Sequence, residues 1–180
     1  MIEINPKNTF LFSDPHFDHA NIIRYCHRPF RNVEEMNNTI IRNYNKTVKD
    51  NSLVYFLGDM AFGRNRRPAN FWFNRLKGHI IYFRGNHDKK GYKETVIHVD
   101  NLHFKLSHFP RNRGDWVGWM IHGHVHDKWP FINYDYKTIN VSVDVTRFKP
   151  VRLSDIIKAV KKYEKRCQIQ GVKEGRSPSS

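Results

Sequence analysis

The sequence predicts a layered α/β fold, and three features support this class. Apolar runs that read as buried strands alternate with amphipathic segments of helical period in the first half of the chain. Polar clusters led by Asp or Gly follow the apolar runs, as they do where parallel strands end at one edge of a sheet. The 180 residues are 39% hydrophobic and 14% aromatic, which is enough to build one full core.

The first half of the chain provides the alternation. Residues 9–13, TFLFS, predict a short buried strand, and residues 32–48 predict a helix with Asn32 as its N-cap. The runs SLVYFLGDM and HIIYFRGNHD predict two further strands that end in polar turns. Between them, PANFWFNRLKG predicts an aromatic helix that begins near Pro68 and ends at Gly78.

The second half predicts a different arrangement. ETVIHVD, LHFKLSH, WVGWMIHGHVH and KTINVSVDVTRF read as strands joined by short turns, and we expect a mostly antiparallel second sheet. The segment SDIIKAVKKYEKR predicts a closing amphipathic helix with Ser154 as its N-cap. We expect residues 1–168 to form a single domain and residues 169–180, rich in Gly, Ser and Pro, to form a flexible tail.

The composition argues against several classes of protein. No apolar run approaches the roughly 20 residues that cross a bilayer, and the first residues lack the features of a signal peptide, so we expect a cytoplasmic protein with no membrane partner. Cys26 and Cys167 lie in separate segments, which argues against a disulfide framework and a cysteine-built zinc site. Any metal is therefore expected to be held by nitrogen and oxygen. The formal charge of +14 attracts polyanions, but charge alone does not separate nucleic-acid binding from a generally basic surface.

Three histidines cluster in the segment MIHGHVHDKW. His122, His124 and His126 occur at every second position, directly after an apolar run. On an extended strand alternate side chains share one face, so the three rings would form a ridge of metal ligands. A solvated polar loop is the alternative, and only partners elsewhere in the chain decide between the two.

Similar donor groups end the other apolar runs. Turn preferences alone explain one such group, but five in succession indicate a metal site. An Asp-x-His pair offers one ion a carboxylate and an imidazole, ligands that suit manganese, iron or zinc. A second carboxylate could bridge two ions, and paired ions suit a displacement at phosphorus. The groups, in chain order, are Asp14 with His16, Asp59, Asn86 with His87, His108, and His124 with His126.

The ordered blocks DPH, GD, GNHD, SH and GHVH, between residues 14 and 126, resemble the motifs of the calcineurin-like metallophosphoesterase superfamily. The segments SDPHFDHANI and VYFLGDMAFG are also similar to its small bacterial, archaeal and phage branch of predicted phosphoesterases. The resemblance implies a four-layer αββα sandwich, in which two mixed β-sheets are flanked by helices. Pro15 departs from the pattern common in this branch but leaves the ligand residues intact.

The resemblance also implies a role for each motif residue. His87 matches the family histidine that contacts the phosphate and would protonate the leaving group, and Asp88 would orient it. Arg84, His19 and His122 are candidates for substrate contact, with plain structural roles as the alternative. The implied metal ligands are Asp14, His16 and His126 for a first ion, Asp59 as the bridge, and Asn86, His108 and His124 for a second ion.

We therefore expect a dinuclear metal-dependent phosphoesterase in which metal-activated hydroxide attacks a phosphate ester. Manganese is the first choice for the two divalent ions, with iron, zinc, nickel or cobalt as alternatives. The short stretch between His108 and His122 leaves little room for a cap, so we expect an open site. An open site and a basic surface favour a phosphodiester, a nucleotide or a nucleic-acid end over a phosphomonoester.

Two other functions compete with this hypothesis. The chain could be a non-catalytic module that binds nucleic acid or serves as a scaffold on the same fold. A metal-dependent hydrolase of another substrate class ranks last, because the HExxH motif typical of zinc peptidases is absent. The sequence leaves the physiological substrate and the oligomeric state open.

Overall fold

Two mixed β-sheets and four α-helices form residues 4–169, the part of the chain that this computed structural model describes. The predicted α/β class, with two mixed sheets and flanking helices, is confirmed. The first sheet has the order β3 (His79–Tyr82), β2 (Leu53–Phe56), β1 (Thr9–Phe12), β9 (Val151–Arg152). The second sheet has the order β4 (Glu94–Val99), β5 (Leu102–Ser107), β6 (Trp119–His122), β8 (Thr138–Asn140), β7 (Ile132–Asn133).

The second sheet is mixed, so the prediction of a mostly antiparallel sheet was wrong. β4 with β5 and β7 with β8 are antiparallel, but β6 is parallel to both β5 and β8. The segment between β5 and β6 contains the short 3-10 helix η1 (Pro110–Arg113) and carries the chain back along the length of β5. Such a crossover is what a parallel pair requires, whereas a tight turn gives an antiparallel one.

Helices occur at the three predicted positions with different lengths, and the helix over Ala20–Tyr25 was not predicted. Asn32 caps α2 as predicted, because its side-chain oxygen accepts a hydrogen bond from the Glu35 amide at 2.9 Å. The predicted aromatic helix ends early, at Phe73, and the closing helix begins at Leu153, so Ser154 lies inside it and is not its cap. The four helices are α1 (Ala20–Tyr25), α2 (Val33–Thr47), α3 (Ala69–Phe73) and α4 (Leu153–Ile169).

The first sheet has a buried cluster on each face, because alternate side chains of β1 point in opposite directions. Leu11 belongs to a cluster between the two sheets, which α4 joins through Ile156 and Val160. Phe10 and Phe12 belong to the other cluster, which packs against α1, α2 and α3. The two sheets and their helices are thus held together by separate layers of apolar side chains.

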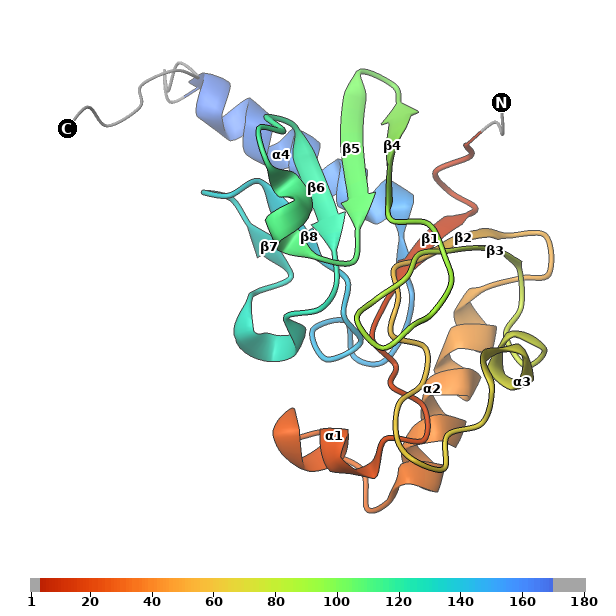
Figure 1. Ribbon diagram of the computed structural model, residues 1–180. Helices are drawn as coiled ribbons and strands as arrows, with labels where there is room; N and C mark the ends of the chain where they lie inside the picture. The colour runs from red at the N-terminus through yellow and green to blue at the C-terminus, as the bar shows by residue number, and fades with distance from the viewer. Residues whose placement is uncertain (1–3, 170–180) are drawn as a thin grey trace.

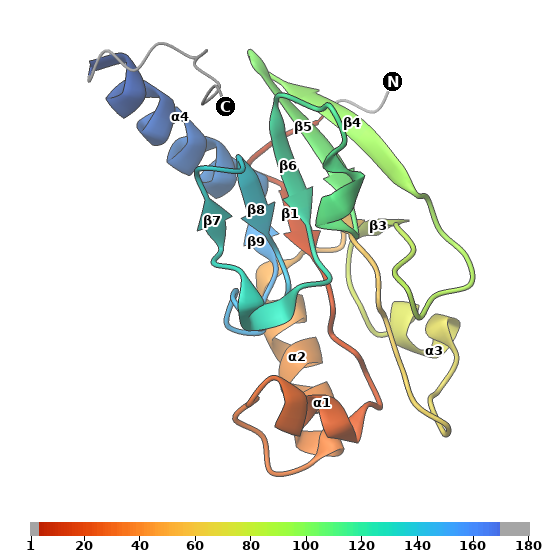
Figure 2. The same cartoon turned by 60° about the vertical axis from the view of Figure 1, so that its left-hand side comes forward.

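The arrangement leaves the strand ends of both sheets near one another. Figures 1 and 2 show α2 and α3 together on one side of the first sheet and α4 beside the second sheet. The loop after β6 meets the loop after β1, because the amide of His124 donates to the carboxylate of Asp14 at 3.0 Å. Ser13, just after β1, forms a parallel bridge to Ser142, just beyond β8.

Two sequence-based expectations concern the chain as a whole. Within residues 4–169, no helix is long and apolar enough to cross a membrane. The flexible tail expected for residues 169–180 lies outside the described residues, except that α4 extends to Ile169.

Candidate metal centre

Backbone hydrogen bonds tie together the loops that follow β1 and β2. The amide of Asp14 donates to the carbonyl of Gly58 at 3.1 Å, and the amide of His16 donates to the carbonyl of Asp59 at 3.2 Å. Two motif loops from adjacent parallel strands are therefore held in register at the edge of the sheet. This register brings the carboxylates and rings of the first two motifs to one place.

Five candidate ligands have a left-handed backbone, which is uncommon for residues other than glycine. Such conformations cost on the order of 1–3 kcal/mol each and concentrate at functional sites. They also exclude one of the two alternatives for the three histidines, a ridge on one strand, because β6 ends at His122 and the two later histidines do not continue it. The residues and their φ angles are Asp14 (60°), His16 (49°), Asp59 (56°), His124 (72°) and His126 (51°).

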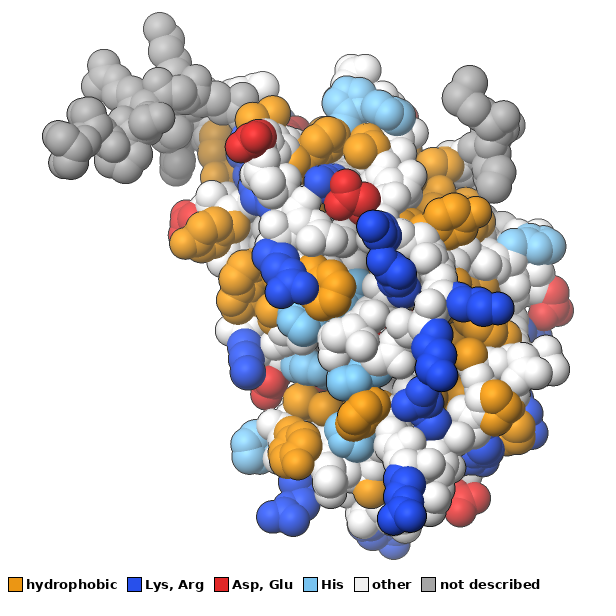
Figure 3. All heavy atoms as spheres, in the orientation of Figure 1, with side chains coloured by type: hydrophobic (Ala, Val, Ile, Leu, Met, Phe, Trp, Pro, Cys, Tyr) orange, Lys and Arg blue, Asp and Glu red, His pale blue; other side chains and the backbone are white. Residues whose placement is uncertain are grey.

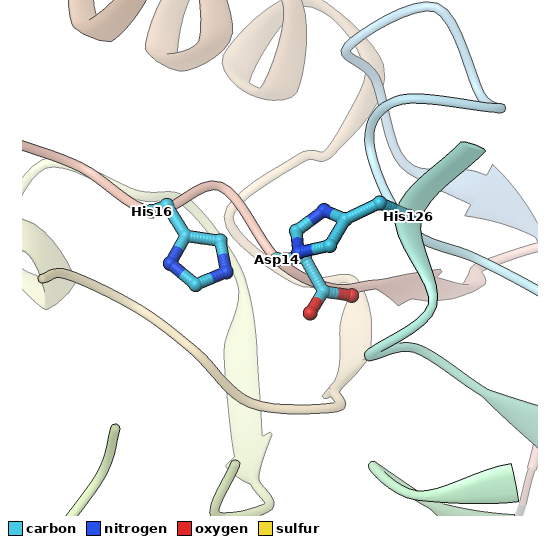
Figure 4. A group of neighbouring side chains, drawn as sticks. All are labelled: Asp14, His16 and His126. Atoms are coloured by element: carbon cyan, nitrogen blue, oxygen red, sulfur yellow. The ribbon is translucent and has the colours of Figure 1, made fainter. Parts of the chain in front are cut away.

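Asp14, His16 and His126 form the first ligand group. One donor atom of each lies within 4.8 Å of the others, and Figure 4 shows the three side chains turned toward a common point. Asp14 is fully buried, and its carboxylate accepts hydrogen bonds from the Ser142 hydroxyl at 2.7 Å and the His124 amide at 3.0 Å. The structure thus brings together the residues predicted to hold the first metal.

The surroundings of the His16 ring indicate whether a metal ion fits the first ligand group. Both of its ring nitrogens are buried, and neither has a hydrogen-bond partner within the described part of the chain. Burial lowers the pKa of His16 to about 3, so the ring is neutral and keeps a free lone pair. An unsatisfied buried polar group costs about 1–3 kcal/mol, and a metal ion would satisfy this one. The residues of the first ligand group therefore fit a divalent ion.

His126 is oriented by a pair of residues that the sequence did not indicate. Its Nδ1 donates to Oδ2 of Asp144 at 2.8 Å, which leaves Nε2 for a metal. Asp144 is itself paired with buried Arg28 at 2.8 Å. Burial alone would lower the pKa of His126, but hydrogen bonds with Asp144 and Cys26 raise it to about 10. A metal at His126 would therefore displace a proton on binding.

Asp59, His108 and His124 form the second ligand group, and their donor atoms also lie within 4.8 Å of one another. Nδ1 of His108 donates to the Leu57 carbonyl at 2.6 Å, which points Nε2 into the group. Asn86 completes it: its side-chain oxygen lies 3.2 Å from Nε2 of His108 and 3.0 Å from Nδ1 of His124. The structure thus brings together the residues predicted for the second metal.

Asp59, a member of the second ligand group, also faces the first. Its Oδ2 atom is 3.4 Å from Nε2 of His16 and 3.4 Å from Nε2 of His108. Burial opposes the charged form of Asp59, but hydrogen bonding and charge from His108 and His16 hold its pKa well below its usual range. Asp59 is therefore a carboxylate placed where one side chain could bind two ions.

Two glycines of the motifs let backbone pass close to the carboxylates. A Cβ atom on Gly123 would overlap the carboxylate of Asp14, and a Cβ on Gly85 would overlap that of Asp59. The motif glycines are thus explained by close approach, which any larger residue would prevent.

His87 lies beside the ligand groups, but Asp88 does not orient it as predicted. The His87 ring packs on Phe62, with ring centroids 3.9 Å apart, and its amide donates to Oδ1 of Asp59 at 3.0 Å. In the described part of the chain the Asp88 carboxylate instead accepts from the amides of Asp59, at 2.6 Å, and Gly85, at 2.8 Å. Asp88 therefore braces the loop that carries Asp59, and Phe62 positions the ring of His87.

The three predicted substrate contacts have different positions. His19 lines a hollow beside His16 and His87, and its Nδ1 atom is buried without a partner among the described residues. His122 is fully buried at the end of β6, where Nδ1 donates to the Gly123 carbonyl at 2.8 Å. Arg84 is half-buried and its amide donates to the Tyr92 carbonyl at 2.9 Å. His19 thus has a position suited to substrate contact, whereas His122 is held inside the fold.

Four residues around the first ligand group were missed from the sequence. Asp144 and Ser142 lie in the alternating segment NVSVDV, which gave no sign that they approach Asp14 and His126. The sequence predicts no metal-binding role for Cys26, yet its sulfur lies within 4.8 Å of donor atoms of His126 and Asp144. Arg28 donates to the backbone carbonyl of Asp14 at 2.9 Å as well as to Asp144. No spacing in the sequence connects these residues to the motifs.

Comparison with known proteins gives relatives over most of the chain. No protein-family model matches it. An uncharacterised protein of Methanocaldococcus jannaschii is 48% identical over 163 residues, covering 87% of this chain and 93% of that protein. A protein of unknown function from Aquifex aeolicus superposes with a TM-score of 0.66 at 26% identity, over 84% of this chain and 98% of that one. A solved structure of an archaeal phosphodiesterase aligns with a TM-score of 0.41 at 16% identity, over 73% of this chain and 81% of that one.

Proposed function

This chain belongs to one family with the Methanocaldococcus jannaschii protein, and from this premise, together with the resemblance of its five motif blocks, we propose that it is a calcineurin-like metallophosphoesterase that uses two divalent metal ions. The first ligand group would hold one ion, and the second ligand group with Asn86 would hold the other. Manganese is our first choice, since carboxylate, amide and imidazole ligands suit it, with iron, zinc, nickel or cobalt as alternatives. We propose a phosphodiester as the preferred substrate.

One observation carries the proposal: a single oxygen of Asp59 lies 3.4 Å from a ring nitrogen of each ligand group. A site for one ion does not require a carboxylate between two sets of imidazoles. When bound, two such ions clamp a phosphate ester and lower the pKa of water near it. All seven predicted ligands are present, which favours a catalytic role over a scaffold that has lost its metals.

The remaining residues supply positioning and a proton. His87 is at the edge of the ligand groups with Phe62 against its ring, so it could donate a proton to a leaving oxygen without binding a metal. The amides of Asp59 and Gly85 are held on Asp88, and Asp144 holds His126, which keeps the donor atoms in place before substrate arrives. His87 also lies within 4.8 Å of donors on His16 and Asp59, so a ligand role is the alternative.

The test is metal-dependent hydrolysis of bis-p-nitrophenyl phosphate by the metal-stripped protein. We expect no turnover in excess chelator, turnover after manganese is added, and no turnover for Asp59→Ala under either condition. Asp50→Ala is a matched control, because Asp50 is exposed and pairs only with Lys77 among the described residues. Full activity of the stripped protein in chelator would contradict the proposal.

A further inference from the structure

The side of the site at His87 has two hollows, and His87 lines both. The first, which we call the basic hollow, has a volume of about 870 Å³ and is lined by Arg66, Lys89, Lys90 and Tyr92 among others. The second, which we call the histidine hollow, has a volume of about 540 Å³ and extends past His16 and His126. His87 contributes to the wall of both. The histidine hollow thus reaches two ligand residues directly, whereas the basic hollow adjoins the site through His87, so a phosphate ester beside His87 has space for a substituent in either hollow.

The basic hollow carries a net positive charge, because Asp88 is the one carboxylate among the residues that line it. Arg66, Lys89 and Lys90 form no ion pair with any described residue, whereas neighbouring Arg67 is paired with Asp18. Figure 3 shows Lys and Arg side chains gathered in a row beside the histidines on this face. Free cations at the wall of a hollow attract a ligand with more than one negative charge, which a polyphosphodiester has.

Each hollow also has an exposed tyrosine. Tyr92 at the basic hollow is 65% exposed, and Tyr25 at the histidine hollow is 68% exposed. Phe73 and Tyr82, with ring centroids 5.0 Å apart, add aromatic surface inside the basic hollow. One exposed tyrosine needs no explanation, but one at each hollow beside His87 gives two platforms on which bases can stack.

We propose that single-stranded nucleic acid passes through the site, with one nucleotide in each hollow and the phosphodiester between them at the ligand groups. The proposal rests on the proposed function and names its substrate class. A duplex does not fit, because its bases are already stacked on each other and offer the tyrosines no free face. The hydroxyl of water would end on phosphorus, the bond to one sugar oxygen would break, and that oxygen would take up the proton that balances the reaction.

The test separates binding from hydrolysis. Binding of fluorescently labelled six-nucleotide single strands, DNA and RNA, is measured by anisotropy with the full chain in excess chelator, over a range of salt concentrations. We expect Lys89→Ala/Lys90→Ala to weaken binding about tenfold at low salt. Each phosphate contact contributes roughly 0.7 to the salt slope, so the loss of two contacts should reduce the slope by about 1.4. Tyr92→Ala is expected to weaken binding about 5- to 150-fold.

Matched variants control for charge and for loss of an aromatic ring. Lys162→Ala/Lys165→Ala removes the same charge from exposed positions of α4 that form no ion pair with any described residue, and Tyr136→Ala removes a tyrosine that is 60% exposed outside both hollows. Both controls should bind single strands within about twofold of the wild type. Equal losses in the two lysine pairs, or equal affinity for a duplex of the same sequence, would overturn the proposal. Hydrolysis of a small diester without strand binding refutes this inference alone, and strand binding without metal-dependent hydrolysis refutes the proposed function alone.

Discussion

Nδ1 of His126 donates a hydrogen bond of 2.8 Å to Oδ2 of Asp144, and Asp144 is in turn held by Arg28. This contact fixes which nitrogen of His126 faces the first ligand group. A carboxylate behind a metal-binding histidine sets its tautomer and its basicity. Asp144 thus fixes the orientation of one ring of the first ligand group.

Asp144→Asn is expected to weaken metal binding at the first ligand group about 10- to 100-fold, because the amide accepts a weaker hydrogen bond from His126. The affinity is measured by calorimetric titration of the metal-stripped variant with manganese. Asp127→Asn is the control, since Asp127 is exposed and adjacent to His126. Unchanged affinity in Asp144→Asn would mean that the contact does not orient the ligand.

His87→Ala is expected to keep both metals and to lower turnover of a phosphodiester about 10²- to 10⁴-fold, the range typical of a lost proton donor. Metal content is measured by elemental analysis of the purified variant, and turnover by steady-state kinetics. His79→Ala, which changes an exposed histidine on β3, should leave both values near those of the wild type. Loss of metal from His87→Ala would show that His87 is a ligand.

Gly85→Ala is expected to destabilise the protein by about 1–3 kcal/mol and to reduce activity further than this loss explains. The added methyl group would overlap the carboxylate of Asp59, which must then move out of its place between the ligand groups. Urea unfolding measures the stability, and metal titration at a temperature where the variant is folded measures the site. Normal metal affinity in the folded variant would show that Asp59 tolerates the displacement.

In the metal-stripped protein, His122 is expected to reduce the free energy of unfolding as pH falls. Burial lowers its pKa from 6.5 to about 4, so the unfolded chain binds a proton between these values that the folded chain does not. The contribution is present above pH 6.5 and is lost as pH falls toward 4, by on the order of 3 kcal/mol in total. Urea unfolding of wild type and His122→Asn in chelator from pH 7 to pH 4.5 should show a shallower decline for the variant; parallel declines would exclude the effect.

The sequence by itself determined the fold class and the motif residues. The buried strands are continuous apolar runs, and the donors directly follow them, so strand-end geometry predicted that Asp14, Asp59 and Asn86 would meet. The left-handed backbone at His124 and His126 could not be predicted, because residues other than glycine adopt it only when the surrounding structure enforces it.

Only the tertiary structure decided what supports the ligands and what surrounds them. The Arg28 to Asp144 pair joins residues 116 apart, and the Ser142 to Asp14 hydrogen bond joins residues 128 apart, so no local pattern marks either. His122 shows the converse, since it stands beside two ligand candidates in the sequence but is buried at the end of β6. The order of residues determines which donor groups follow each strand. Contacts between distant segments form only when the two sheets pack together.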